Sequence, residues 1–211
     1  MDNRFPCVGA KSALGKRQLE IVTARSIASS WNDLDVHRRL MSFAEGHQED
    51  PKLFRSFAVI YAAPRLMSEK AFEQHMWARI QSMTDKDVWL GQQQDQGISA
   101  EPDNPYFSLS FGGSAFFVVG LHPGASRAAR RFRYPTLIFN LHDQFERLRE
   151  AGRYEKLRGA ILARDRALQG SDNPMLSRHG ETSEARQYSG RAVPAGWTAP
   201  YNRPEPLKDI A

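Results

Sequence analysis

The chain has 211 residues, of which 41% are hydrophobic, and its 29 Lys and Arg against 24 Asp and Glu give a net charge of +5. This length fits one domain at roughly 100–200 residues per domain, and the composition argues against wholesale disorder. The basic residues are spread along the chain rather than gathered into blocks, so nucleic-acid binding is permitted but not indicated. No apolar stretch approaches the ~18–20 residues of a membrane span, which argues against membrane insertion.

The single cysteine and the start of the chain bear on the cellular compartment. Cys7 has no second cysteine with which to form an intramolecular disulfide, and the first residues lack the long apolar region of a secretion signal. The sequence therefore predicts a cytoplasmic protein. We expect a single domain over residues 1–211, with a body over residues 1–168 and an extended tail over residues 169–211 that wraps around it.

The first part of the chain predicts three helices and one strand. After an extended segment over residues 4–16, apolar residues at near-helical spacing predict an amphipathic helix over residues 17–30. A second amphipathic helix is predicted over residues 34–47. β-branched and aromatic residues then predict a central strand over residues 53–64, and an N-cap serine precedes a helix predicted over residues 69–83.

The second part begins with a polar surface loop over residues 91–105. Two strands follow over residues 106–121, joined as a hairpin at Gly112-Gly113, because two glycines tolerate the positive φ of a tight turn. Three further elements are predicted: a strand over residues 134–141, a helix over 142–152 and a helix over 153–168. Because helices and strands mix without strict alternation, we expect an α+β fold with a mainly antiparallel sheet.

His122 directly follows an apolar strand, and Pro123 and Gly124 turn the chain immediately after it. A rigid strand end can fix an imidazole in place to bind a metal or haem iron. A half-buried histidine that is hydrogen-bonded to a loop carbonyl is the simpler interpretation, and composition alone favours it.

Three arginines follow His122, with the second and third lying three and four residues after the first: Arg127, Arg130 and Arg131. If these residues form a helical turn, they share one face close to His122. Guanidinium groups bind carboxylates and phosphates with two parallel hydrogen bonds, as haem propionates, nucleotides or acidic substrates require. The alternative is a solvated basic face.

Other candidate side chains are weaker. His142 is the second candidate for a metal or haem ligand, although a core histidine is the simpler interpretation. Three interpretations of Cys7 are open: a haem thiolate, a nucleophile or a small buried residue. His75 is weaker still, and three histidines are expected to be exposed: His37, His47 and His179. Histidine pairs at the spacing of a zinc helix are missing, which argues against zinc or di-iron. In the tail, Arg186, Tyr188 and Arg191 form either a lid or a solvated extension.

Five segments in the same order resemble the YqcI/YcgG family: "FPCVGAKSAL", "FFVVGLHPGASRAARRF", "FNLHDQFERLR", "LQGSDNPML" and "SEARQYSGR". The chain resembles in particular the haem-dependent guanidine N-hydroxylases of guanitoxin biosynthesis. The resemblance implies a haem b enzyme that uses O2 and an external electron donor to hydroxylate a nitrogen of a guanidine or amine. A haem-binding or haem-sensing protein without turnover is the alternative, and a homodimer is left open.

Within this resemblance, we expect His122 to be the axial ligand, with His142 as the alternative, and the three arginines and Cys7 to contact the cofactor. Four apolar residues are expected to line its walls: Phe116, Phe117, Val118 and Phe132. Glu184 is the candidate partner of a guanidinium substrate. The segment "GWTAPY" departs from the family pattern, because Ala199 stands where a cysteine is expected.

Overall fold

A computed structural model describes residues 6–178 and 180–205, and in these residues five strands form one sheet in the order β1-β2-β5-β4-β3. In chain order the strands are β1 (Leu19–Ser26), β2 (Ser56–Ala63), β3 (Leu109–Phe111), β4 (Ser114–Leu121) and β5 (Thr136–Leu141). β1 and β2 run parallel, and the other neighbouring pairs are antiparallel. The predicted α+β fold with a mainly antiparallel sheet is therefore confirmed.

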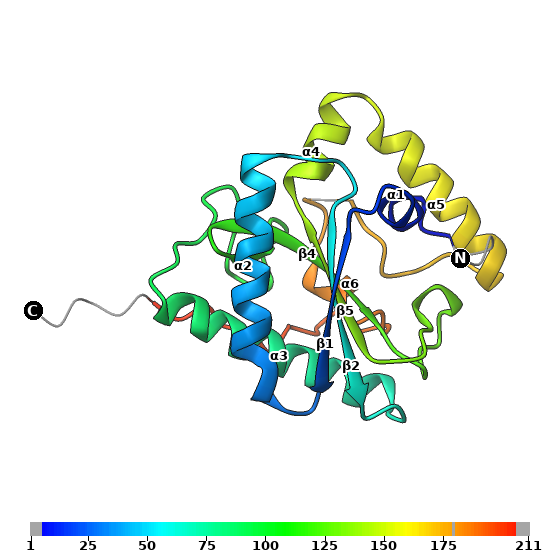
Figure 1. Cartoon of the computed structure of the whole chain (residues 1–211). Helices are drawn as coiled ribbons and strands as arrows, with labels where there is room; N and C mark the ends of the chain where they lie inside the picture. The colour runs from blue at the N-terminus through cyan, green and yellow to red at the C-terminus, as the bar shows by residue number, and fades with distance from the viewer. Residues whose placement is uncertain (1–5, 179, 206–211) are drawn as a thin grey trace, which may run out of the picture.

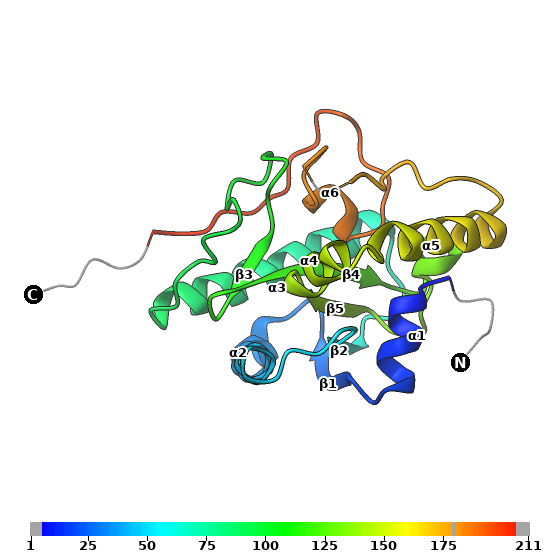
Figure 2. The same ribbon diagram turned by 90° about the horizontal axis from the view of Figure 1, so that it is seen from above.

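Helices cover both faces of this sheet. They are α1 (Val8–Gly15), α2 (Asp33–Glu49), α3 (Glu69–Trp89), α4 (Asp143–Glu150), α5 (Tyr154–Gln169) and α6 (Ala185–Tyr188). Two short 3-10 helices are η1 (Ser30–Asn32) and η2 (Ala128–Arg130). Figure 1 shows α2 and α3 on one side of the sheet and α1 and α5 on the other, and Figure 2 shows the same layers from above.

The main core lies between the sheet and the α2–α3 layer. Side chains alternate between the two faces of a strand, so Phe116 and Val118 of β4 join this core. Phe116 packs edge-on against Phe139 of β5 at a centroid distance of 6.2 Å. Phe117, between them in the sequence, points to the opposite face, toward α4 and α5. The two faces of β4 therefore serve different purposes: one stabilises the core, and the other borders a cavity.

The helix predicted over residues 17–30 is wrong, because most of this segment is the edge strand β1. Val22 and Ala24 are buried, whereas Ile21, the residue directly before Val22, is 54% exposed. This alternation has a period of two, as in a strand. Hydrogen bonding to β2 stabilises the strand, and the weaker 3.6-residue pattern does not produce a helix. The extended segment predicted over residues 4–16 is also wrong where α1 forms. There the Cys7 sulfur accepts a hydrogen bond from the Ala10 N–H at 3.3 Å and caps the helix.

The hairpin is confirmed, with φ angles of 56° at Gly112 and 72° at Gly113. The helices predicted after residue 33 and the strands predicted after residue 52 are present, although β2 is the second strand of the sheet rather than its centre. Apart from α6, the described residues beyond α5 form neither helix nor strand, as expected for an extended tail, and they run along the body (Figure 2). In the part of the chain that the structure describes, no helix is both long and apolar enough to span a membrane.

Candidate functional site

A cavity of about 200 Å³ lies on the sheet face that carries α4 and α5. Its walls come from β4, α4, α5 and the tail. The apolar lining consists of Phe117, Phe145, Tyr154, Leu157, Ile161, Leu162 and Leu176. The polar lining consists of Arg149, Arg158, Ser177, Glu184 and Gln187. Apolar walls with a few convergent polar groups are typical of a small-molecule site, so this cavity is the candidate functional site.

Glu184 is the acidic group of the cavity, and His142 fixes its position. The His142 Nε2 atom lies 2.9 Å from the Glu184 Oε2 atom, and both side chains are buried. The Ser108 hydroxyl also donates to Oε2, at 3.4 Å. His142 is held in turn because it is the residue between β5 and α4, where Phe145 packs edge-on against its ring. A buried carboxylate with these partners is a fixed acceptor at the edge of the cavity.

The basic groups of the cavity are not neutralised by acidic neighbours. Arg158 is half-buried and, among the residues that the structure describes, has no hydrogen-bond or ion-pair partner. The Arg149 guanidinium lies over the Tyr154 ring, 4.8 Å from its centroid. Arg149 and Tyr154 also border a second, more exposed hollow of about 300 Å³. The cavity therefore combines one held carboxylate with an arginine that has no partner in the part of the chain that the structure describes.

His122 lies on the other face of the sheet, away from this cavity. Its ring stacks on Phe72 of α3, with centroids 4.4 Å apart and planes at 21°. Its Nδ1 atom is buried without a hydrogen-bond partner among the described residues. Burial lowers the pKa of His122, and the nearby Glu69 only partly opposes this shift. The neutral imidazole is therefore the favoured form, and this is the form that binds metals.

The three arginines after His122 are turned toward different protein groups. Arg127 binds Asp165 and the carbonyls of the segment after α5. Arg130 donates to the carbonyls of Gly120, Gln187 and Tyr188, at 3.0–3.2 Å. Arg131 donates to the carbonyls of Ala125 and Ser126. Arg127 and Arg130 therefore connect the loop after β4 to α5 and to the tail, whereas Arg131 binds within the loop itself.

Cys7 belongs to the same neighbourhood as Arg130. Burial lowers the pKa of Arg130 to about 10, and electrostatic interactions with Cys7 and Asp165 oppose this shift, whereas Arg127 adds to it. The structure therefore brings Cys7, Arg127 and Arg130 together at the junction of α1, α5 and the loop after β4. Cys7 serves there as the cap of α1.

A haem would need an axial ligand atom, a flat apolar slot and cations for its propionates. His122 offers a neutral imidazole with an unbonded nitrogen, which suits the first requirement. The apolar slot and the cations for the propionates are not present around His122. The three arginines are bound to protein groups, and the Phe72 ring lies against the imidazole where a haem would need space. The cavity at Glu184 is smaller than the ~300–1,000 Å³ of most ligand sites. The described residues thus supply a ligand atom but do not form a haem slot in this arrangement.

The four apolar residues expected to form haem walls do not share one pocket. Phe116 and Val118 lie in the core, Phe117 lines the cavity, and Phe132 is 40% exposed. The reason is the alternation of neighbouring strand residues between opposite faces. Ala199, where a cysteine was expected, is buried in the core beside the tail residue Tyr201.

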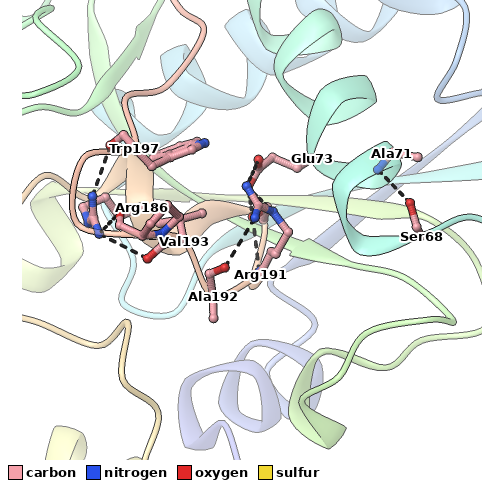
Figure 3. Close-up of polar contacts among 10 residues, drawn as sticks. Ser68, Ala71, Glu73, Arg186, Arg191, Ala192, Val193 and Trp197 are labelled. Carbon is pink, nitrogen blue, oxygen red and sulfur yellow. Dashed lines mark hydrogen bonds and ion pairs between the residues drawn. The ribbon is translucent and has the colours of Figure 1, made fainter.

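The tail residues Arg186, Tyr188 and Arg191 anchor the tail to the body. Arg191 forms an ion pair with the buried Glu73 of α3 at 2.6 Å (Figure 3). Arg186 closes a loop by donating to carbonyls within the tail, which belong to Val193, Pro194, Ala195 and Trp197. Tyr188 is fully buried, with its ring 5.3 Å from that of Phe117. These contacts hold Glu184, in the same segment, against the cavity.

The expectation that His37 and His47 are exposed is wrong. Both are buried, because each imidazole is bonded to an aspartate from another element: Asp87 of α3 for His37 and Asp143 of α4 for His47, each at 2.8 Å. His179 lies outside the described residues. No three His, Cys, Asp or Glu side chains gather as a metal-binding group within residues 6–178 and 180–205.

Sequence reasoning found Glu184, His142 and Phe117 but missed most of the cavity lining. The α5 residues that face it, Leu157, Arg158 and Ile161, have the 3–4-residue spacing of one helix face, which is the signal that could have indicated them. A comparison with protein families matches residues 1–202 to the YqcI/YcgG family. Searches of the curated proteins and of the solved structures each found no match.

Proposed function

Since the chain belongs to the YqcI/YcgG family, we propose that it binds a small guanidine or amine in the cavity at Glu184 and hydroxylates one of its nitrogens. In this proposal a haem b, which the resemblance implies, would supply the oxidising chemistry, although the described residues do not form a slot for it in this arrangement. The overall reaction would place one oxygen atom of O2 in the new N–O bond and release the other as water, with two electrons from an external donor and two protons. The resemblance to haem-dependent guanidine N-hydroxylases motivates the reaction, and the Glu184 cavity motivates the substrate.

The observation that carries the proposal is a buried carboxylate in a cavity with aromatic walls. A carboxylate accepts two parallel hydrogen bonds from a guanidinium group, and this geometry is the reason for placing the cation at Glu184. The rings of Phe117, Phe145 and Tyr154 also line the cavity, and aromatic faces attract cations. An organic cation is therefore the ligand that these groups suit.

His142 is a positioning residue in this proposal. Its contact at 2.9 Å holds the Glu184 carboxylate in one orientation, and its place at the start of α4 makes that orientation rigid. A cation that enters the cavity then meets an acceptor that needs no rearrangement. Preorganisation of this kind favours binding because less conformational entropy is lost.

The haem half of the proposal rests on the family resemblance. His122 has a buried, unbonded nitrogen, but it lies on the opposite face of the sheet from the cavity at Glu184. The test of the haem half is an absorption spectrum of protein expressed with a haem precursor, repeated for His122→Ala, His142→Ala and Cys7→Ala. We expect a Soret band that His122→Ala shifts or abolishes. Protein that takes up no haem would contradict this half, and loss of the band in another variant would assign the ligand to that residue.

Turnover separates the enzyme from a haem carrier or sensor. We expect O2 uptake that requires both a reductant and a guanidine, and we expect Glu184→Gln to reduce it because the neutral amide attracts the cation less. Haem uptake without substrate-dependent O2 consumption would favour the non-catalytic alternative.

A further inference from the structure

The edge strand β1 carries a row of backbone groups that face away from the sheet. The Ser56 N–H of β2 donates to the Gln18 carbonyl at 3.0 Å, so Gln18 and every second residue after it face β2. The residues between them, Leu19, Ile21 and Thr23, turn their N–H and C=O groups outward. Within the part of the chain that the structure describes, no hydrogen bond reaches these outward groups. An unpaired strand edge of this kind is a template for a further strand.

The open part of this edge ends at Arg25. The Arg25 N–H also points outward, but it donates to the Asn32 side chain at 3.0 Å. This contact agrees with the alternation along β1 and closes the edge toward its C-terminal end. Three outward residues therefore remain, with Ile21 at their centre. An identical strand that pairs antiparallel about Ile21 uses all three.

Exposed apolar side chains lie in the middle and at both ends of the open edge. Leu14, just before the strand, Ile21 within it and Trp31 just after it are between 47% and 75% exposed. Trp31 lies beside the C-terminal end of β1, since the Arg25 guanidinium is 5.8 Å from its ring centroid. Figure 2 shows β1 at the outer edge of the sheet, with α1 and α2 to either side. Exposed apolar residues around an open edge are typical of an interaction surface.

From this edge we infer that two copies of the chain form a dimer by pairing β1 with β1 of the partner, antiparallel about Ile21. Ile21 then lies opposite its symmetry mate, and Leu19 lies opposite Thr23 of the partner, so that each pair exchanges both of its N–H···O bonds. The two-fold axis also brings the Leu14 end of one copy to the Trp31 end of the other. A second copy suits this edge because the surface is complementary to itself.

Charge does not drive this contact. Arg17 and Arg25 lie at opposite ends of the strand, so the two-fold axis brings Arg17 of one copy near Arg25 of the other, and like charges repel. We therefore expect added salt to strengthen the dimer, because salt screens the repulsion. A dimer that dissociates in salt would show that a different, charged surface holds it.

Analytical ultracentrifugation of the full chain is the first test. We expect a particle with twice the 23.9 kDa mass of one chain. Two variants should dissociate it for different reasons: Ile21→Lys places two charges at the two-fold axis, and Thr23→Pro removes an outward N–H that β2 does not use. Trp89→Lys, at an exposed tryptophan at the end of α3, is the control and should remain dimeric.

A cysteine cross-link tests the register of the pairing. In a chain that carries Cys7→Ser, which keeps a capping side chain on α1, Ile21→Cys places a thiol opposite its symmetry mate. The Cα separation of such a pair is about 5.5 Å, which a disulfide spans. Glu20→Cys is the matched control: it is also exposed, but it lies opposite Val22 of the partner and should not cross-link.

The mass of one chain at every concentration, a dimer that survives Ile21→Lys, or equal cross-linking at residues 20 and 21 would overturn the inference. Thermal melting followed by circular dichroism checks that each variant is folded. If Ile21→Lys or Thr23→Pro does not fold, the cross-link at residue 21 decides the question. None of these measurements involves a ligand, so the proposed function is tested separately.

Discussion

The His142 imidazole and the Glu184 carboxylate meet at 2.9 Å, although 42 residues separate them in the chain. This contact joins the start of α4 to the tail and closes one side of the cavity. Both side chains are less than 9% exposed, so solvent screens their interaction little.

Removing either partner should therefore destabilise the fold. We expect Glu184→Ala to lower the free energy of unfolding by about 1–3 kcal/mol, because it leaves a buried imidazole with one partner fewer. Urea unfolding measures this effect, and a double-mutant cycle with His142→Ala isolates the pair. Glu155→Ala, which removes a carboxylate paired with Arg178 in an exposed position, is the control and should change stability little. A Glu184→Ala effect as small as that of the control would count against a structural role for the pair.

The Glu73–Arg191 ion pair should keep the tail on the body (Figure 3). Glu73 accepts from Arg191 at 2.6 Å and from the Ser189 hydroxyl at 2.9 Å. We expect Arg191→Met to expose the tail, because the buried Glu73 then loses its charged partner. Faster amide hydrogen exchange in the described residues around Ser189 would reveal this. Arg39→Met, at an exposed pair with Asp35, should leave the exchange unchanged; equal protection in both variants would rule out an anchoring role.

Gly120 of β4 should resist replacement by alanine. A methyl group added there would lie 2.7 Å from the Phe72 ring and 3.0 Å from the Tyr188 carbonyl oxygen. Because Phe72 carries the stacked His122 ring, we expect Gly120→Ala to disturb that stack and to cost about 1–3 kcal/mol of stability. Gly159→Ala in α5 has nothing within 4 Å and should stabilise by about 0.5–1 kcal/mol. Similar melting temperatures for the two variants would contradict this close approach.

Asp143 should make the fold sensitive to acid. Burial would raise the pKa of Asp143, but hydrogen bonds and charges from His47 and Arg147 together outweigh it and lower the pKa below the usual 3.8. A lowered acid pKa contributes stability above the unfolded value, and this stability is lost as the pH falls from about 3.8 through the folded value. We expect Asp143→Asn to lose less stability than the parent chain over that range. Parallel stability curves for the two proteins, followed by urea unfolding at each pH, would argue against this linkage.

Much of the architecture was determined by local sequence. The Gly112-Gly113 turn was predictable because its positive φ angles depend on those two residues alone. The helices α2, α3, α4 and α5 were predictable because apolar residues recur along one face of each. The family was also visible in the sequence, since its segments keep their order along the chain.

Three features depend on tertiary structure alone: the strand β1, the burial of His37 and His47, and the cavity at Glu184. Residues 17–30 carry both a helical and an alternating pattern, and only pairing with β2 selects the strand. The two histidines look exposed until α3 and α4 bring an aspartate to each. The cavity joins side chains from β4, α4, α5 and the tail. Short-range periodicity reports which face of an element is buried, but it does not specify which distant face meets it, and that pairing places Glu184 and Arg158 in one cavity.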